Sequence, residues 1–130
     1  MREILFRGKC PDNGKWVEGF IVASRENTYQ DGFEMITADG INYDELDSYI
    51  PDFTSYAVDP NTVGQYTGLK DKNGKRIWEG DILALRGGRP LVVRFEDGAF
   101  ILECSSIPMR FANKFEVIGN ITDNPELLEK

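Results

Sequence analysis

Two carboxylates, Glu79 and Asp81, form the pair in this sequence that is best placed for acid–base chemistry. They flank Gly80 at the entrance to an expected strand, where side chains two residues apart point to the same face. Both carboxylates could therefore meet one cation or one substrate proton. A Glu-Gly-Asp sequence also turns the chain and bonds backbone amides, and paired acids perturb each other in ordinary networks. This structural role is the favoured interpretation of the pair.

A basic hairpin tip with nearby aromatic rings is the second arrangement that could bind a ligand. Four cations surround the turn at Asn73-Gly74, and Tyr66 and Trp78 lie on the adjoining strands. Cations that bind phosphate and rings that stack on bases are the composition of a nucleic-acid contact. Lysine-rich tips are also routine solvated turns, which is the favoured interpretation. The residues predicted for nucleic acid are Lys70, Lys72, Lys75, Arg76 and Trp78.

The sequence contains no histidine, which excludes Ser-His-Asp and Cys-His catalysis and histidine-ligated metals. Ser105 and Ser106 therefore have no histidine to activate them, and no GxSxG frame surrounds them. The two cysteines, Cys10 and Cys104, lie far apart without a CxxC spacing, so no zinc site is expected and both thiols are predicted to be buried. No catalytic residue is predicted, and we expect the chain not to be an enzyme.

The net charge of −7 comes from one central segment. Residues 26–69 hold nine acidic and no basic side chains, whereas residues 1–25 hold three acidic and five basic ones and residues 70–130 hold ten of each. Such a segment repels nucleic-acid phosphates and favours a cationic partner, or it only keeps the chain soluble. Nucleic acid is therefore a less favoured partner than protein.

Four of the central acids could bind a divalent cation through their oxygen atoms. Their spacing is not that of an EF-hand loop, which needs acids at positions 1, 3 and 5, Gly at 6 and Glu at 12. No metal site and no cofactor are therefore predicted. The four acids are Asp44, Glu45, Asp47 and Asp52.

Short strands separated by turns must position these residues. With 130 residues, 41% of them hydrophobic, the chain is long enough to bury one core. The Asn-Gly pairs at 13–14 and 73–74 each predict a hairpin turn in which both residues adopt a positive φ, and Asp97-Gly98 predicts a further hairpin. Expected strands cover residues 2–7, 15–23, 63–69, 75–78, 82–85, 91–95, 99–104 and 115–121.

The pattern is weaker between residues 24 and 59. Residues 33–36 indicate one strand and residues 41–43 another, while the polar stretch from Pro51 to Pro60 is predicted to be surface loop. At the other end of the chain, Asn124 is expected to cap a short helix that begins at Pro125.

Three separated segments together resemble a known family. They are REILFRGK at residues 2–9, VGQYTGLKDKNGKRIWEGDIL at 63–83 and EVIGNITDNPELL at 116–128. Their order and content are similar to those of the YopX-like family of phage and prophage proteins. The resemblance implies a β-rich fold whose C-terminal part is like an SH3-type barrel, and it brings no established activity.

We therefore expect a single mainly β domain over residues 1–130, a hairpin-rich small barrel or sandwich. Residues 1–59 would form an N-terminal β subregion with an acidic loop, and residues 60–130 an SH3-like β-barrel with a short C-terminal helix. No apolar run approaches the roughly 20 residues that a membrane helix needs, so a cytoplasmic protein of the bacterial host is expected.

The leading functional hypothesis is a phage or prophage accessory protein of unknown biochemical activity. It would be a non-enzymatic module that binds protein, either a second copy of itself in a homo-oligomer or a host or phage protein. One alternative is a nucleic-acid module that uses the basic tip at residues 70–76. Another is a hydrolase that uses the carboxylates of Glu79 and Asp81.

Overall fold

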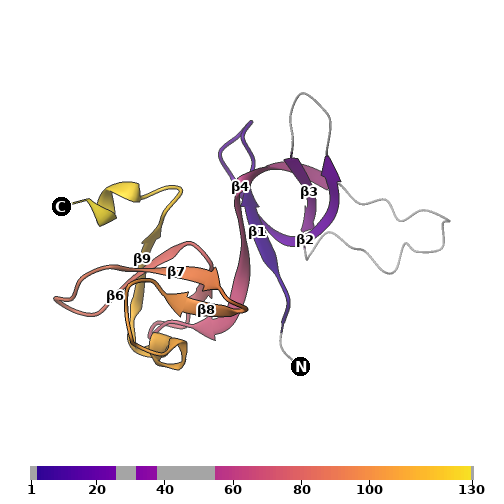
Figure 1. Ribbon diagram of the computed structural model, residues 1–130. Coiled ribbons are helices and arrows are strands. Elements are labelled where there is room, and N and C mark those ends of the chain that lie inside the picture. The colour runs from indigo at the N-terminus through magenta and orange to yellow at the C-terminus, as the bar shows by residue number, and fades with distance from the viewer. Residues whose placement is uncertain (1–2, 26–31, 38–54, 130) are drawn as a thin grey trace. The chain divides into compact units, whose positions relative to one another are not determined.

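The computed structural model describes residues 3–25, 32–37 and 55–129, and these residues are mainly β, as predicted (Figure 1). The chain divides into two compact units: Leu5–Gly64, and Gln65–Lys130 together with Met1–Ile4. The SH3-type character of the C-terminal region stays a prediction, as does the division of one domain into residues 1–59 and 60–130. Within the described residues, no helix is both long and apolar enough to span a bilayer.

The N-terminal unit is a small antiparallel sheet that closes on itself. Its strands are β1 (Phe6–Lys9), β2 (Trp16–Arg25), β3 (Gly32–Thr37) and the first part of β4 (Ser55–Lys70), and each pairs with the next. A further pairing of β1 with β4 completes the ring that Figure 1 shows. The ring encloses a small core made by Cys10, Val17, Met35 and Val58.

Close packing inside this ring explains why residue 8 is a glycine. A Cβ atom at Gly8 would lie 2.9 Å from the Cβ of Val58 and 3.1 Å from the sulfur of Met35. A side chain at this position would therefore push β1 away from β4. The core is so thin that the bare backbone of β1 must form part of its wall.

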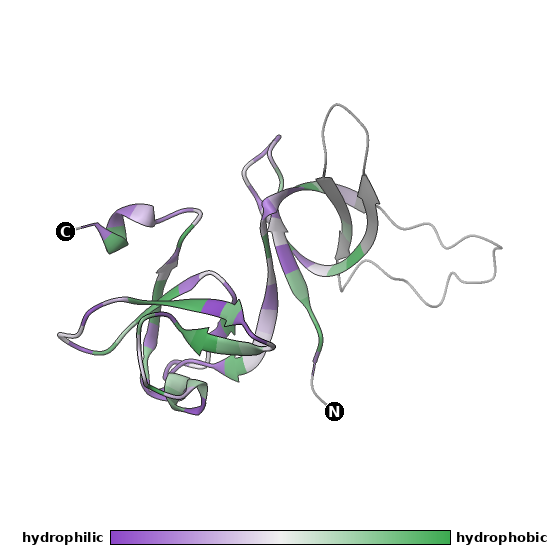
Figure 2. Cartoon of the chain, viewed as in Figure 1, coloured by the Kyte–Doolittle hydropathy of each residue, from purple (hydrophilic) through white to green (hydrophobic). Residues whose placement is uncertain are grey.

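The C-terminal unit is built on a four-stranded antiparallel sheet. Its order is β8 (Ala99–Leu102), β7 (Leu91–Glu96), β6 (Asp81–Ala84) and β9 (Glu116–Asn120). The end of β4 pairs separately with β5 (Arg76–Trp78). One core joins these strands to the 3-10 helix η2 (Met109–Lys114). In Figure 2 strand β8 is coloured hydrophobic, whereas β7 contains polar residues toward its end. The buried core residues are Ile77, Leu83, Leu91, Val93, Leu102, Ala112, Phe115 and Val117.

The C-terminal segment packs against β9 near its end. The predicted short helix is present as the 3-10 helix η3 (Pro125–Leu128). The predicted capping of η3 by the Asn124 side chain is wrong. Its Oδ1 instead accepts a hydrogen bond from the Asn120 backbone at 3.2 Å. A Cβ atom at Gly119 would lie 2.6 Å from this Oδ1, so the contact requires glycine there.

The hairpin turns differ in backbone geometry. Asp97 and Gly98 have φ of 52° and 83°, as a two-residue type I′ turn requires. At the two Asn-Gly pairs only Gly14 and Gly74 have a positive φ, so the predicted pair of positive angles is wrong there. The physical reason is a longer loop: Gly14 donates to the Cys10 carbonyl, and only the glycine takes the left-handed conformation.

The predicted surface loop from Pro51 to Pro60 is wrong for its last six residues. Strand β4 begins at Ser55 and continues through Pro60, because pairing with β3 (Phe33 opposite Val58) outweighs the local signal of a proline. Residues 38–54, which include the predicted strand at 41–43 and the four clustered acids, lie outside the described residues.

The two cysteines differ in their exposure to solvent. Cys10 is buried in the N-terminal unit, as predicted. Cys104 is exposed, follows the end of β8 and has a φ of 58°, so its predicted burial is wrong. Strand β8 ends at Leu102, two residues before Cys104, so the chain has left the sheet where the thiol lies.

Candidate functional site

A buried carboxylate holds the basic hairpin in place. Asp71 Oδ1 accepts hydrogen bonds from the backbone N–H groups of Asn73 (2.8 Å) and Lys75 (2.9 Å). Its Oδ2 accepts one from Val117 in β9 at 2.9 Å. Burial raises the pKa of the Asp71 carboxyl, but these backbone donors act more strongly and hold its pKa below the ordinary value. Asp71 is therefore ionised at neutral pH and fixes the hairpin to β9.

The hairpin places its predicted phosphate-binding cations at the surface. Lys70 and Lys75 are exposed, and the Lys72 ammonium lies 3.7 Å from the Glu116 carboxylate. The Arg76 guanidinium bonds Glu3 at 2.9 Å.

The two aromatic rings of the nucleic-acid hypothesis are buried and do not lie at the surface of the hairpin. Trp78 is only 3% exposed and packs on Tyr66 with ring centres 5.5 Å apart. The Arg76 guanidinium also covers Tyr66, at 5.3 Å from the ring centre. Both rings belong to the interior, so the surface of the hairpin offers cations without a ring for a base. Nucleic-acid binding by this set stays a prediction.

The carboxylates of Glu79 and Asp81 have different environments. Asp81 is 1% exposed, and its Oδ2 accepts a hydrogen bond from the Trp78 backbone at 2.8 Å, which closes the turn around Gly80. Glu79 is partly exposed, and its Oε1 lies 3.5 Å from the Gln65 backbone nitrogen. Asp81 thus has a structural bond within the turn, and catalysis by the pair stays a prediction.

Metal ligands do not gather in the part of the chain that the structure describes. Within that part, no group of three or more Cys, Asp or Glu side chains could hold a metal ion. The clustered acids of the central segment fall outside it.

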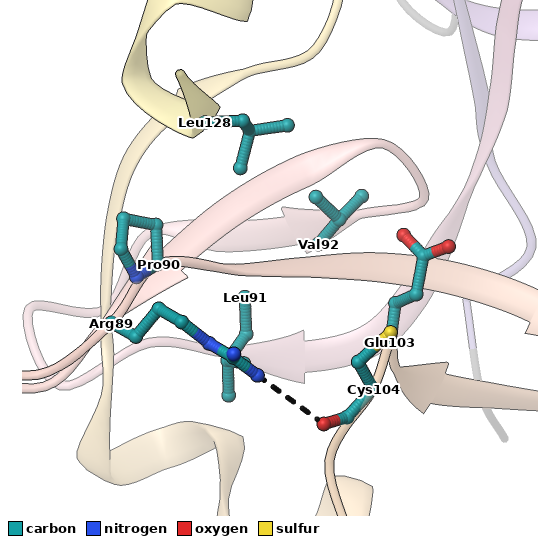
Figure 3. Close-up of a pocket in the computed structure, with 7 residues that line it drawn as sticks. All are labelled: Arg89, Pro90, Leu91, Val92, Glu103, Cys104 and Leu128. Atoms are coloured by element: carbon teal, nitrogen blue, oxygen red, sulfur yellow. Dashed lines mark hydrogen bonds between the residues drawn. The ribbon is translucent and has the colours of Figure 1, made fainter. Parts of the chain in front are cut away.

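A small groove lies between the start of β7 and the residues that follow β8 (Figure 3). Its volume is about 220 Å³, and its apolar lining includes Pro90, Val92 and Leu128. At one side the Arg89 guanidinium reaches the carbonyl oxygen of Cys104 at 3.4 Å. The groove is of a size for one apolar side chain rather than for a drug-sized ligand.

The two edges of the four-stranded sheet are protected differently. Along β9, the Val117 N–H is bonded to Asp71 and the Phe115 carbonyl accepts from the Lys72 backbone at 3.0 Å, so the 71–75 hairpin covers this edge. On the other side, β8 pairs with β7, and no described strand pairs with its outer edge. Of the two edge strands, β8 is the one beside which no described strand or hairpin lies, although its Leu102 carbonyl accepts a hydrogen bond from the Ser105 backbone at 3.2 Å.

Exposed aromatic surface accompanies this free edge. Phe95 of β7 is 50% exposed and lies opposite Phe100 of β8, with ring centres 5.0 Å apart at an interplanar angle of 68°. Sequence reasoning missed this pair, although a signal existed: both residues are two positions from the Asp97-Gly98 turn, which makes them cross-strand neighbours.

Comparison with known proteins identifies a family and a similar solved structure. A family model described as YopX protein matches residues 5–129. The crystal structure of protein EF1440 from Enterococcus faecalis is similar with a TM-score of 0.72 and 28% sequence identity, and the alignment covers 99% of this chain and 100% of that chain. No curated protein matches the sequence. Neither of these names states an activity.

Proposed function

This chain belongs to the YopX protein family, and we propose that it is a non-enzymatic, protein-binding module that associates with copies of itself. In this proposal it serves as an accessory protein of a phage or prophage in the cytoplasm of the bacterial host. The single observation that supports self-association is the free edge of β8, beside which the Phe95 ring is half exposed.

The composition of β8 favours a second copy as the partner. Its four residues, Ala99–Leu102, are all apolar, so two β8 strands paired about a two-fold axis would place no like charges opposite each other. Natural edge strands usually carry a lysine, a proline or a bulge that prevents such pairing, and β8 has none of these. Pairing would join two sheets into one and cover the Phe95 and Phe100 rings.

Sedimentation velocity of the full chain over a range of concentrations tests this function. We expect a concentration-dependent dimer that is lost in Phe95→Lys, which places a charge beside the edge. The matched control is Ile118→Lys, a residue of β9 that is 39% exposed at the covered edge of the same sheet. A monomer at every concentration, or dimer loss in the Ile118 variant alone, contradicts the proposal.

A further inference from the structure

The hairpin between β4 and β5 carries positive charge that self-association does not use. Strand β4 ends at Lys70, and the turn that follows holds Lys72 and Lys75; all three lysines are exposed. The Asp71 carboxylate fixes this turn through two hydrogen bonds within it and a third to Val117 in β9. The three ammonium groups therefore extend from a turn that is tied to the four-stranded sheet.

The fold brings a fourth lysine to this turn. The Lys72 backbone N–H donates to the Phe115 carbonyl at 3.0 Å, so the turn lies against the chain where η2 passes into β9. Lys114 is the last residue of η2, immediately precedes Phe115 and is exposed. It is far from the hairpin in sequence, and only the tertiary structure places it there. We call these four residues the lysine cluster: Lys70, Lys72, Lys75 and Lys114.

The acids beside the lysine cluster do not neutralise it. The Glu116 carboxylate lies 3.7 Å from the Lys72 ammonium, and the ionised Asp71 carboxylate interacts with the charge of Lys75. Arg76 is left out of the count, because a neighbouring carboxylate pairs with it at 2.9 Å. Four ammonium groups and two carboxylates leave a net charge of +2 at the cluster.

The acidic excess of the chain belongs to the other unit. The unit that holds the lysine cluster comprises residues 1–4 and 65–130, and it has eleven basic and eleven acidic side chains. Residues 5–64, with four basic and eleven acidic side chains, therefore account for the whole net charge of −7. The cluster is a positive patch on a unit that is neutral as a whole, which suits a polyanionic partner.

The composition of the turn indicates which polyanion fits. Protein interfaces are depleted in lysine and depend on aromatic or apolar anchors. Among residues 70–75 every exposed residue is a lysine, Asn73 or Gly74, and none is apolar. A single strand requires rings on which its bases stack, whereas Tyr66 and Trp78 are buried. In a duplex the bases stack on each other, and the phosphates outside them require only cations.

We propose that the lysine cluster binds the phosphate backbone of a nucleic-acid duplex without reading its sequence. A lysine ammonium is a point charge on a flexible stem, so it contacts phosphate without the fixed geometry that base recognition needs. DNA and RNA duplexes share this chemistry. The inference goes beyond self-association and is independent of it, because the cluster lies at the β9 edge of the sheet and β8 forms the other edge.

Fluorescence anisotropy of the full chain with a short labelled DNA duplex tests the cluster. We expect the affinity to fall about 40-fold between about 50 and 200 mM salt, a log–log slope of about −2.7, as for three neutralised phosphates. Lys75→Gln and Lys114→Gln should each reduce this slope by about 0.9. The matched control is Lys15→Gln, an exposed lysine after the other Asn-Gly turn, which should leave the slope unchanged. Glu116→Gln should strengthen binding, because it frees its lysine partner.

Two further ligands identify the polyanion. An RNA duplex of the same length shows which helix is preferred, and either order of the two affinities agrees with the proposal. Polyglutamate that displaces the duplex equally well at equal charge would assign the cluster to an acidic protein and overturn the proposal. It is also overturned by no binding of either duplex at about 50 mM salt, by tighter binding of single-stranded DNA, or by equal losses in Lys15→Gln and Lys75→Gln.

Discussion

The Oδ2 atom of Asp71 accepts a hydrogen bond from the backbone N–H of Val117 at 2.9 Å, across 46 residues of sequence. Together with the bond from the Lys72 N–H to the Phe115 carbonyl, this contact joins the β4–β5 hairpin to β9 and covers one edge of the four-stranded sheet. No described strand pairs with the other edge, β8. The asymmetry between the two edges is the basis for assigning self-association to β8.

Removal of the Asp71 carboxylate should destabilise the chain strongly. In Asp71→Ala the backbone N–H groups of Asn73, Lys75 and Val117 lose their acceptor, and buried donors without partners are costly. We expect a loss of about 2–4 kcal/mol in the free energy of unfolding, measured in urea. Asp97→Asn, in an exposed turn with a φ of 52° that asparagine tolerates, should change it by less than about 0.5 kcal/mol.

The stabilisation from Asp71 should depend on pH. Its pKa is lower in the folded chain than the ordinary value of 3.8, so its contribution is complete well above pH 3.8 and is lost as the pH falls through the folded-state pKa. The difference in unfolding free energy between the unaltered chain and Asp71→Asn should therefore be constant near neutral pH and shrink in acid. A difference that grows below pH 4 contradicts this account.

The two thiols should react at very different rates. Burial, followed by the charge of Asp12, raises the pKa of Cys10, and only the thiolate attacks a disulfide reagent. Cys104 is exposed. With Ellman's reagent we expect one fast and one slow equivalent, and Cys104→Ser should remove the fast one. A fast equivalent that survives this substitution would show that Cys10 is accessible in the folded chain.

Gly119→Ala should loosen the C-terminal segment. The new methyl group would lie 2.6 Å from Asn124 Oδ1 and 2.9 Å from Leu127 Cδ1, which forces both side chains to move. We expect a loss of about 1–3 kcal/mol in unfolding free energy. In a double-mutant cycle, adding Asn124→Ala should cost less than it does alone, because the clash is relieved. If the two losses in unfolding free energy simply add, the clash with Asn124 is not the cause of the destabilisation.

Much of the strand layout follows from local sequence. Alternating apolar residues and glycine-containing turns placed β5 to β9 within two residues of their observed limits, because register in a hairpin depends on a few neighbouring residues. The family resemblance, drawn from three segments, is confirmed over residues 5–129. Local pattern also identified the Glu79–Asp81 turn, although not that Asp81 would be the buried member.

Long-range pairing decided the rest. Strand β4 runs through Pro60 because β3 pairs with it, and the exposure of Cys104 depends on where the chain leaves the sheet. The same holds for the candidate sites: the nucleic-acid hypothesis requires the Trp78 ring at the surface, yet packing buries it and leaves Trp16, beside Arg7, more exposed. By itself the sequence determined which residues turn and which extend, since those preferences are local. Only the tertiary structure decided which edge is covered and which ring is accessible, because both depend on contacts between residues far apart in the chain.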